Sequence, residues 1–244
     1  MKKALVFEVS KLKRQKIWLL ILFIPLVSVV LGLGNFLGNY EVLMDKPTDN
    51  GWLEAWTQIT LFYGLIFLPV LSGIYAALVC RTDHLNGGWK LQFSFPISRY
   101  TIYFSKFIVV ISLIFFTQLV LLLIYLIGGT MVIDDPIPFG FLFQAMLLSW
   151  IGTFSTVAFQ LWLSYKIKSF SIPLGINLGL AIFVFVAYTL EYGFIFPMAQ
   201  PAFAMAAPDE GRVDSILMLV LTMLLTLIII APLASWRFNK EELT

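Results

Sequence analysis

Six long runs without a charged residue constrain this chain more than any other feature. A helix rises 1.5 Å per residue, so about 20 apolar residues cross the roughly 30 Å hydrocarbon core of a bilayer. Backbone groups in lipid must be hydrogen-bonded within the segment, so we expect helices and not the alternating strands of a barrel. The runs are Ile17–Tyr40, Ala55–Cys80, Phe107–Ile133, Pro136–Tyr165, Ser169–Leu190 and Ser215–Trp236.

The composition agrees with a membrane protein. The 244 residues are 60% hydrophobic and 12% charged, whereas a soluble domain is about 45–50% apolar and about 25% charged. We therefore predict an all-α integral membrane protein, with a single membrane domain over residues 1–244. The predicted segments are an interfacial helix at 4–16 and spans near 17–38, 56–80, 101–127, 139–164, 173–191 and 214–236.

The loop charges predict the orientation. With both termini inside, the inner segments hold fourteen of the sixteen Lys and Arg residues and four acids, a net charge of +10. The outer segments hold two basic residues and ten acids, a net charge of −8. Because basic residues concentrate in short cytoplasmic loops, we expect a multi-pass protein with both termini in the cytoplasm.

The first sixteen residues, MKKALVFEVSKLKRQK, predict an amphipathic helix. Leu5, Val9 and Leu12 recur at helical spacing, and such a helix lies in the membrane interface with its cations near anionic headgroups. The simpler alternative is a positive-inside anchor without a defined helix. The residues expected to anchor this segment at the interface are Lys11, Lys13, Arg14, Lys16 and Trp18.

A polar block from Arg81 to Lys106 interrupts the apolar sequence between the second and third spans. Asp83–Phe95 is long enough for a short helix under the membrane, and Asp83, His84 and Lys90 would then face a cytosolic partner. Alternation over 89–95 also fits a strand, although an isolated strand leaves backbone groups unpaired. A loop that only fixes topology is the third reading. After Pro96, Ser98 is placed to cap the third span.

A second unusual segment, Tyr192–Pro208, carries no charge but contains Pro197, Pro201 and Pro208. It is too broken to span a membrane and too apolar for a free loop. We expect short re-entrant or interfacial helices on the outer side; the alternative is an apolar loop resting on the bundle.

Several kinds of chemistry have no sequence basis here. The chain has no G-x-x-x-x-G-K-[ST] phosphate-binding loop, and one His and one Cys cannot build a zinc site. The six charge-free runs contain no Asp, Glu, Lys, Arg or His, which disfavours ion-coupled transport. We therefore expect no enzyme activity, metal or cofactor in this chain, and an energy source outside it.

The polar block resembles the loop after the second span in ATP-binding cassette (ABC) permeases of the type-2 export class. The lantibiotic-immunity and bacteriocin-protection permeases are the most similar in pattern. Matching residues, in order, are Asp83, Gly88, Trp89, Lys90, Pro96, Ser98, Arg99, Tyr103 and Lys106. The family more often has Glu where this chain has Asp83.

This resemblance implies a permease subunit of an ABC exporter in a bacterial cell membrane, moving an amphiphilic or peptide-like substrate such as a lantibiotic. Its partners would be an ABC ATPase subunit that binds ATP and magnesium, a second or sister permease, and membrane lipids, but no nucleic acid. The alternative is a non-transporting immunity or scaffold protein. Residues implied to couple to the ATPase are Asp83, His84, Gly88, Trp89, Lys90, Pro96, Ser98 and Arg99.

Overall fold

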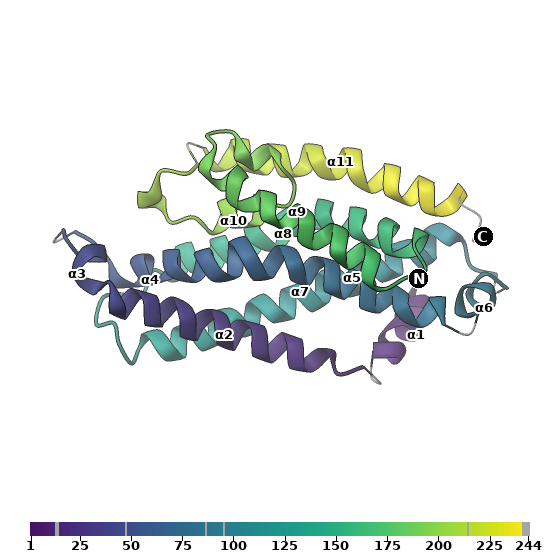
Figure 1. The fold of residues 1–244 in the computed structure, drawn as a ribbon, viewed down its shortest axis with the longest axis horizontal. Helices are drawn as coiled ribbons and strands as arrows, with labels where there is room; N and C mark the ends of the chain where they lie inside the picture. The colour runs from purple at the N-terminus through teal and green to yellow at the C-terminus, as the bar shows by residue number, and fades with distance from the viewer. Residues whose placement is uncertain (13–14, 47, 86, 95, 214, 241–244) are drawn as a thin grey trace.

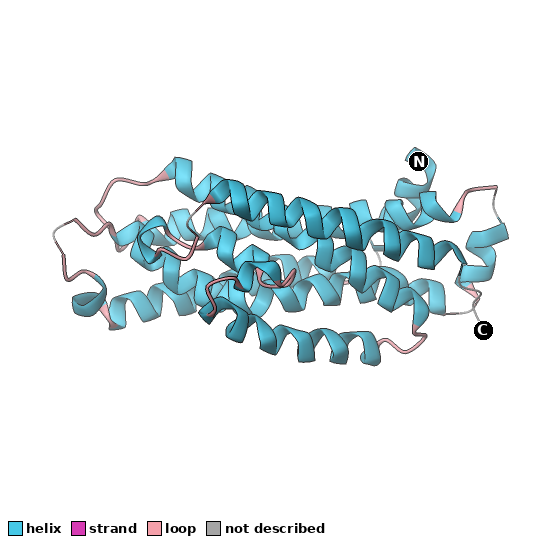
Figure 2. Cartoon of the chain, turned by 90° about the horizontal axis from the view of Figure 1, so that it is seen from above, coloured by secondary structure: helices cyan, strands magenta, loops and turns pink. Residues whose placement is uncertain are grey.

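The computed structural model describes residues 1–244 except 13–14, 47, 86, 95, 214 and 241–244. The described part consists of helices and loops, without a strand (Figure 2). Six helical segments in it are long and apolar enough to cross a membrane, which confirms the predicted all-α fold. These are Ile17–Gly38, Gly51–His84, Arg99–Gly129, Phe139–Lys166, Ser171–Thr189 and Ile216–Lys240.

The bundle is organised around α8 (Phe139–Lys166), which packs against α5 (Leu68–His84), α7 (Arg99–Gly129) and α11 (Ile216–Lys240). On one side α2 (Ile17–Gly38) packs against α7, and on another α9 (Ser171–Thr189) packs against α5 (Figure 1). Helix α8 carries a row of buried polar side chains at helical spacing. Its members are Ser149, Thr153, Thr156, Gln160 and Ser164.

The second span is longer than the predicted 56–80. It begins with α4 (Gly51–Ile59), because the Asn50 side chain caps the helix by accepting from the amide of Trp52 at 2.9 Å. A π-helical segment, η1 (Thr60–Phe67), then leads into α5. Pro69 follows at once, and we attribute the wider turn to it, since proline lacks an amide hydrogen and clashes with the preceding turn.

The proline-broken segment folds into η2 (Gly193–Ile195), α10 (Gln200–Met205) and η3 (Pro208–Glu210). Helix α10 is buried against α8 and does not rest on the bundle surface. The Trp56 indole donates to the carbonyl of Met205 at 2.8 Å, and the Gln200 amide donates to Thr226 at 3.2 Å. These contacts hold α10 inside the bundle as one of the short helices that the sequence predicts, and its re-entrant or interfacial place in a membrane stays a prediction.

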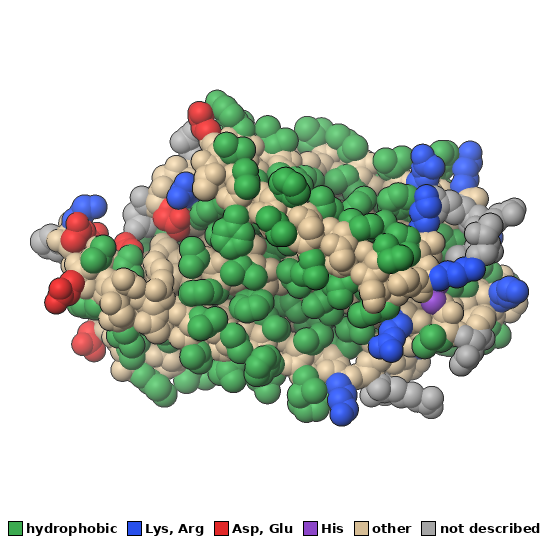
Figure 3. Space-filling model, viewed as in Figure 1, with side chains coloured by type: hydrophobic (Ala, Val, Ile, Leu, Met, Phe, Trp, Pro, Cys, Tyr) green, Lys and Arg blue, Asp and Glu red, His purple; other side chains and the backbone are tan. Residues whose placement is uncertain are grey.

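Helices α1 (Lys2–Leu12) and α6 (Gly88–Ser94) lie at one end of the bundle, and α3 (Tyr40–Leu43) lies at the other (Figure 1). Lys and Arg side chains gather around the first end, and most visible Asp and Glu side chains lie at the second (Figure 3). We call them the basic end and the acidic end. The charge separation matches the separation counted along the sequence.

Candidate functional site

Four charged side chains from three helices meet at the basic end. Lys106 of α7 donates to Glu8 of α1 at 2.9 Å and to the carboxylate of Asp83 on α5. Lys11 of α1 donates to the same two carboxylates, at 2.8 Å and 2.7 Å. We call Glu8, Lys11, Asp83 and Lys106 the charged cluster; its two positive and two negative charges cancel.

Burial makes this cluster sensitive to the loss of any member. Lys106 is 1% exposed, and Glu8 and Asp83 are also buried. A buried charge is tolerated only when it is paired and hydrogen-bonded, as each of these is. Burial lowers the pKa of Lys11, and the charge of Lys106 lowers it further, against the opposing effect of Asp83 and Glu8. The cluster therefore joins the ends of α1, α5 and α7 through ion pairs.

The N-terminal helix is rotated relative to the sequence prediction. Ala4 is buried with Glu8, and Leu5 and Leu12 pack on the core, but Val9 is exposed. Two of the three predicted residues, Leu5 and Leu12, therefore lie on the inward face, whereas Val9 does not, because Glu8 turns inward to meet Lys106.

Of the predicted interfacial anchors, Lys11 points into the charged cluster and not toward headgroups. The helix also ends at Leu12, earlier than the predicted residue 16. Lys13 and Arg14 lie outside the described residues. Lys16 and Trp18 are exposed at the start of α2, where an anchor is expected.

The predicted single helix over Asp83–Phe95 is two helices with a glycine turn between them. Helix α5 continues through His84, and α6 begins at Gly88. Gly87 has φ +70°, a conformation that favours glycine. A Cβ on Gly88 would lie 2.9 Å from the Cα of Asp83, so the start of α6 packs directly on the backbone of α5.

The sequence had suggested that Asp83 and His84 face outward, toward a cytosolic partner. In the structure they do not. The Trp89 indole donates to Nδ1 of His84 at 3.2 Å, and Nε2 of His84 lies 2.7 Å from the carbonyl oxygen of Ser164. Since an indole N–H can only donate, Nδ1 accepts and Nε2 carries the proton toward Ser164. His84 thus links α6 to α8 through one hydrogen bond at each ring nitrogen.

Helix α6 is held by five other helices. Trp89 is buried, with its ring 4.9 Å from that of Tyr165 on α8 and 5.8 Å from that of Phe238 on α11. Lys106 lies 5.0 Å above the Trp89 ring. Gln92 donates to Glu8 at 2.7 Å. Helices α1, α5, α7, α8 and α11 therefore all contact α6.

The opposite face of α6 is open to solvent. Lys90 and Ser94 are exposed, and Leu91 is 60% exposed. This face therefore presents one cation, one apolar side chain and one hydroxyl that no other helix in the described part of the chain covers.

The connection from α6 to α7 is also largely exposed. Pro96 and Ser98 are exposed, and Ser98 caps α7 by accepting from the amide of Thr101 at 3.2 Å, which confirms the predicted cap. Arg99 is partly buried, lies 4.6 Å above the Phe93 ring and donates to the carbonyl of Asn239 at 3.1 Å.

The family assignment follows from a match over most of the chain. A family model described as "ABC-2 family transporter protein" matches residues 4–185 of the 244. The chain belongs to the ABC-2 transporter family. No curated protein and no solved structure matches it. ABC-2 members are membrane permease subunits of ABC transporters, whose ATPase is typically a separate subunit.

The matched part of this ABC-2 permease includes the whole charged cluster and α6, and ends within α9. Sequence reasoning missed Glu8 and Gln92, which tie α1 to α6. A signal for Glu8 was present, because it lies four residues from both Ala4 and Leu12 and so shares their face. Among the described residues, no group of three His, Cys, Asp or Glu is placed to hold a metal ion.

Proposed function

We propose that this permease subunit forms half of the membrane part of an ABC exporter, with α6 as the helix that receives force from the ATPase. The observation that carries this proposal is the two-sidedness of α6. One face contacts five helices through hydrogen bonds and ring contacts, and the other exposes Lys90, Leu91 and Ser94. A partner that moves α6 would move the ends of the spans with it. ATP and magnesium would be bound by that partner.

The charge separation supports an orientation in which the basic end and both termini are cytoplasmic, in a bacterial cell membrane. A soluble ATPase would then reach α6 directly. A second copy of this chain, or a sister permease, would complete the pathway.

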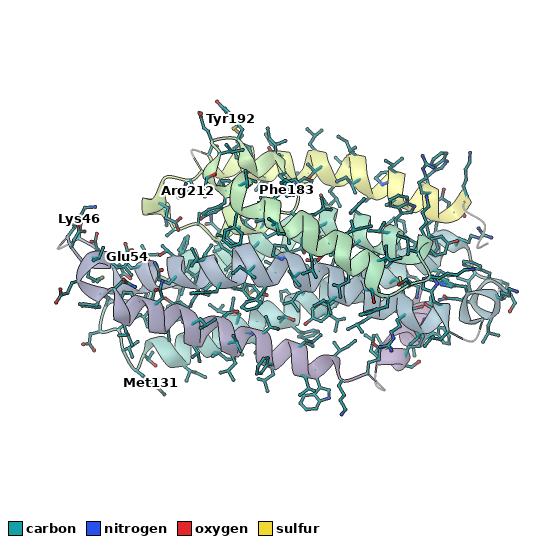
Figure 4. All side chains as sticks on the ribbon, viewed as in Figure 1. Lys46, Glu54, Met131, Phe183, Tyr192 and Arg212 are labelled. Atoms are coloured by element: carbon teal, nitrogen blue, oxygen red, sulfur yellow. The ribbon has the colours of Figure 1, made fainter. Side chains whose placement is uncertain are left out.

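A hollow at the acidic end supports the proposal that the substrate is amphiphilic or peptide-like. A hollow of about 470 Å³ lies between α4, η1 and α9. Leu61 and Phe185 line it together with the charged Glu54 and Arg212, and Figure 4 shows these last two at the end opposite to α6. A molecule with both apolar and charged parts matches such walls, and lantibiotics and bacteriocins belong to this class.

Docking of the ATPase is tested by capturing the tagged chain from its native cells and identifying the ABC ATPase that co-purifies. The variant Leu91→Glu, combined with Lys90→Glu, changes only the exposed face of α6. We expect loss of the ATPase from the captured complex and loss of ATP-dependent export from membrane vesicles. Lys16→Glu, a charge reversal elsewhere at the basic end, should change neither. An unchanged complex in the α6 variant would contradict the docking proposal.

The same experiment separates an exporter from a non-transporting immunity or scaffold protein. Resistance to a bacteriocin that persists when no ABC ATPase is captured, and when ATP is depleted, would favour the second function. We favour the exporter because the chain belongs to a transporter family.

A further inference from the structure

A small pocket at the basic end is lined by His84, which links it to α6, but by no member of the charged cluster. It has a volume of about 180 Å³ and is bounded by the end of α5, the end of α8 and the start of α9. Its lining residues that matter here are Arg81, Leu85, Ser164, Ile167, Lys168 and Phe170. Three candidate spans end or begin here, so the pocket lies where lipid headgroups meet the bundle.

Two cations at this pocket have no carboxylate partner among the described residues. Arg81 and Lys168 are both exposed, and the only contact that Arg81 makes in this part of the chain is over the ring of Phe170, at 5.5 Å. This differs from the charged cluster, where each cation is neutralised by carboxylates. The pocket therefore has a net positive charge that a ligand can neutralise.

Uncharged hydrogen-bond donors at the pocket also favour an anion. Helix α9 begins at Ser171 without a side-chain cap, so the amides of Ser171 and Ile172 have no partner within the helix, while Pro173 has no N–H; helix N-termini favour anions. Ser164 lines the pocket and is 3% exposed, yet its hydroxyl has no hydrogen-bond partner within the described structure. A buried hydroxyl normally has a partner, so this one is free to donate to an acceptor that enters the pocket. The ring nitrogens of His84 are already hydrogen-bonded to the Trp89 indole and to the backbone carbonyl of Ser164, so the Ser164 hydroxyl is not their partner.

We propose that this pocket binds the phosphate of an anionic phospholipid. Arg81 and Lys168 would neutralise the phosphate, while Ser164 and the start of α9 would donate hydrogen bonds to it. The neighbouring surface suits acyl chains, because Ile172 and Ile176 are exposed along the outer side of α9 and Leu85 is exposed at the pocket. The lipid would sit at the junction of α5, α8 and α9, in the cytoplasmic leaflet if the proposed orientation holds.

Native mass spectrometry of the purified full chain, without its ATPase, tests this inference independently of transport. The probes are phosphatidylglycerol and the zwitterionic phosphatidylcholine, added at matched concentrations. The variants are Arg81→Gln with Lys168→Gln, and separately Ser164→Ala. The matched control is Arg237→Gln with Lys240→Gln, which removes two exposed cations from the basic end outside the pocket. Size-exclusion chromatography confirms that each variant remains monodisperse.

We expect phosphatidylglycerol binding to weaken about tenfold or more in the double pocket variant, since each cation near an anionic lipid contributes about 1 kcal/mol. Ser164→Ala should weaken it less, and the control should retain it. Equal losses in the pocket and control variants would show general charge attraction and overturn the site. So would equal binding of both lipids.

Two further outcomes distinguish other occupants. Displacement of the lipid by millimolar inorganic phosphate would show that the pocket binds free phosphate, and would overturn the lipid as its source. If the double variant retains the lipid but releases the ATPase in the capture experiment above, the pocket belongs to the protein interface and the inference is wrong.

Discussion

Lys106 of α7 donates a hydrogen bond of 2.9 Å to Glu8 of α1, although 98 positions separate the two residues. The same ammonium contacts Asp83 at the end of α5 and lies above the ring of Trp89 on α6. One buried cation thus connects the N-terminal helix, the end of the second span, the start of the third and the helix between them. Motion of α6 would therefore disturb the contact between Lys106 and Trp89 and the hydrogen bond from Gln92 to Glu8, which join α6 to this cluster.

Removing this cation should destabilise the bundle. Lys106→Met keeps the length of the side chain but leaves Glu8 and Asp83 with Lys11 as their one cation within the cluster. Breaking a buried ion pair in this way costs about 3–5 kcal/mol of the free energy of unfolding. Thermal denaturation in detergent, followed by tryptophan fluorescence, measures the change. Lys16→Met at an exposed position is the control, and equal melting temperatures for the two variants would contradict the role of the cluster.

The spans were predictable because charges are costly in hydrocarbon. Each charge-free run became a helix, and the acids and bases separated to opposite ends as the loop charges predicted. The cap by Ser98 was also predictable, since it depends only on neighbouring residues. These features follow from local composition.

The charged cluster was not predictable in the same way. It depends on the rotation of α1 about its axis and on approaches between residues far apart, such as Lys11 and Asp83. The predicted orientation of Asp83 failed because a carboxylate at the end of a span can face either water or a buried lysine, and the local sequence does not decide. The polar row on α8 was missed for another reason: a count of charges does not register Ser, Thr and Gln, as at Gln160.

The glycine at the start of α6 should tolerate no side chain. In Gly88→Ala the new Cβ would meet the Cα of Asp83 at 2.9 Å and the carbonyl oxygen of Thr82 at 3.0 Å, both of them backbone atoms. Helix α6 must then shift, at a cost of about 1–3 kcal/mol. Hydrogen exchange of the α6 amides, measured by mass spectrometry, should become faster. Gly140→Ala is the control, because nothing lies within 4 Å of its Cβ; similar exchange in both variants would argue against close packing.

Helix α10 should become more accessible to solvent when its hydrogen bond from the Trp56 indole is removed. Trp56→Phe deletes the 2.8 Å hydrogen bond to the carbonyl of Met205 and leaves only Thr60, at 3.4 Å. A buried carbonyl that loses its partner costs about 1–3 kcal/mol. A cysteine introduced as Ala202→Cys in the buried α10 should then react faster with a maleimide, while Cys80 stays buried. Trp18→Phe, at an exposed position, should leave the labelling rate unchanged, and a slow reaction in both backgrounds would show that Trp56 does not hold α10.

The two ends of the bundle should react on opposite sides of the membrane. Ser94→Cys places a thiol on the exposed face of α6 at the basic end, and Thr48→Cys places one on the exposed loop between α3 and α4 at the acidic end. Because basic residues are retained in the cytoplasm during insertion, an impermeant maleimide should label only Thr48→Cys in right-side-out vesicles. Inverted vesicles should give the opposite pattern, and the wild-type chain, with its buried Cys80, supplies the background. Labelling of Ser94→Cys from the outside would reverse the proposed orientation and place α6 beyond the reach of a cytoplasmic ATPase.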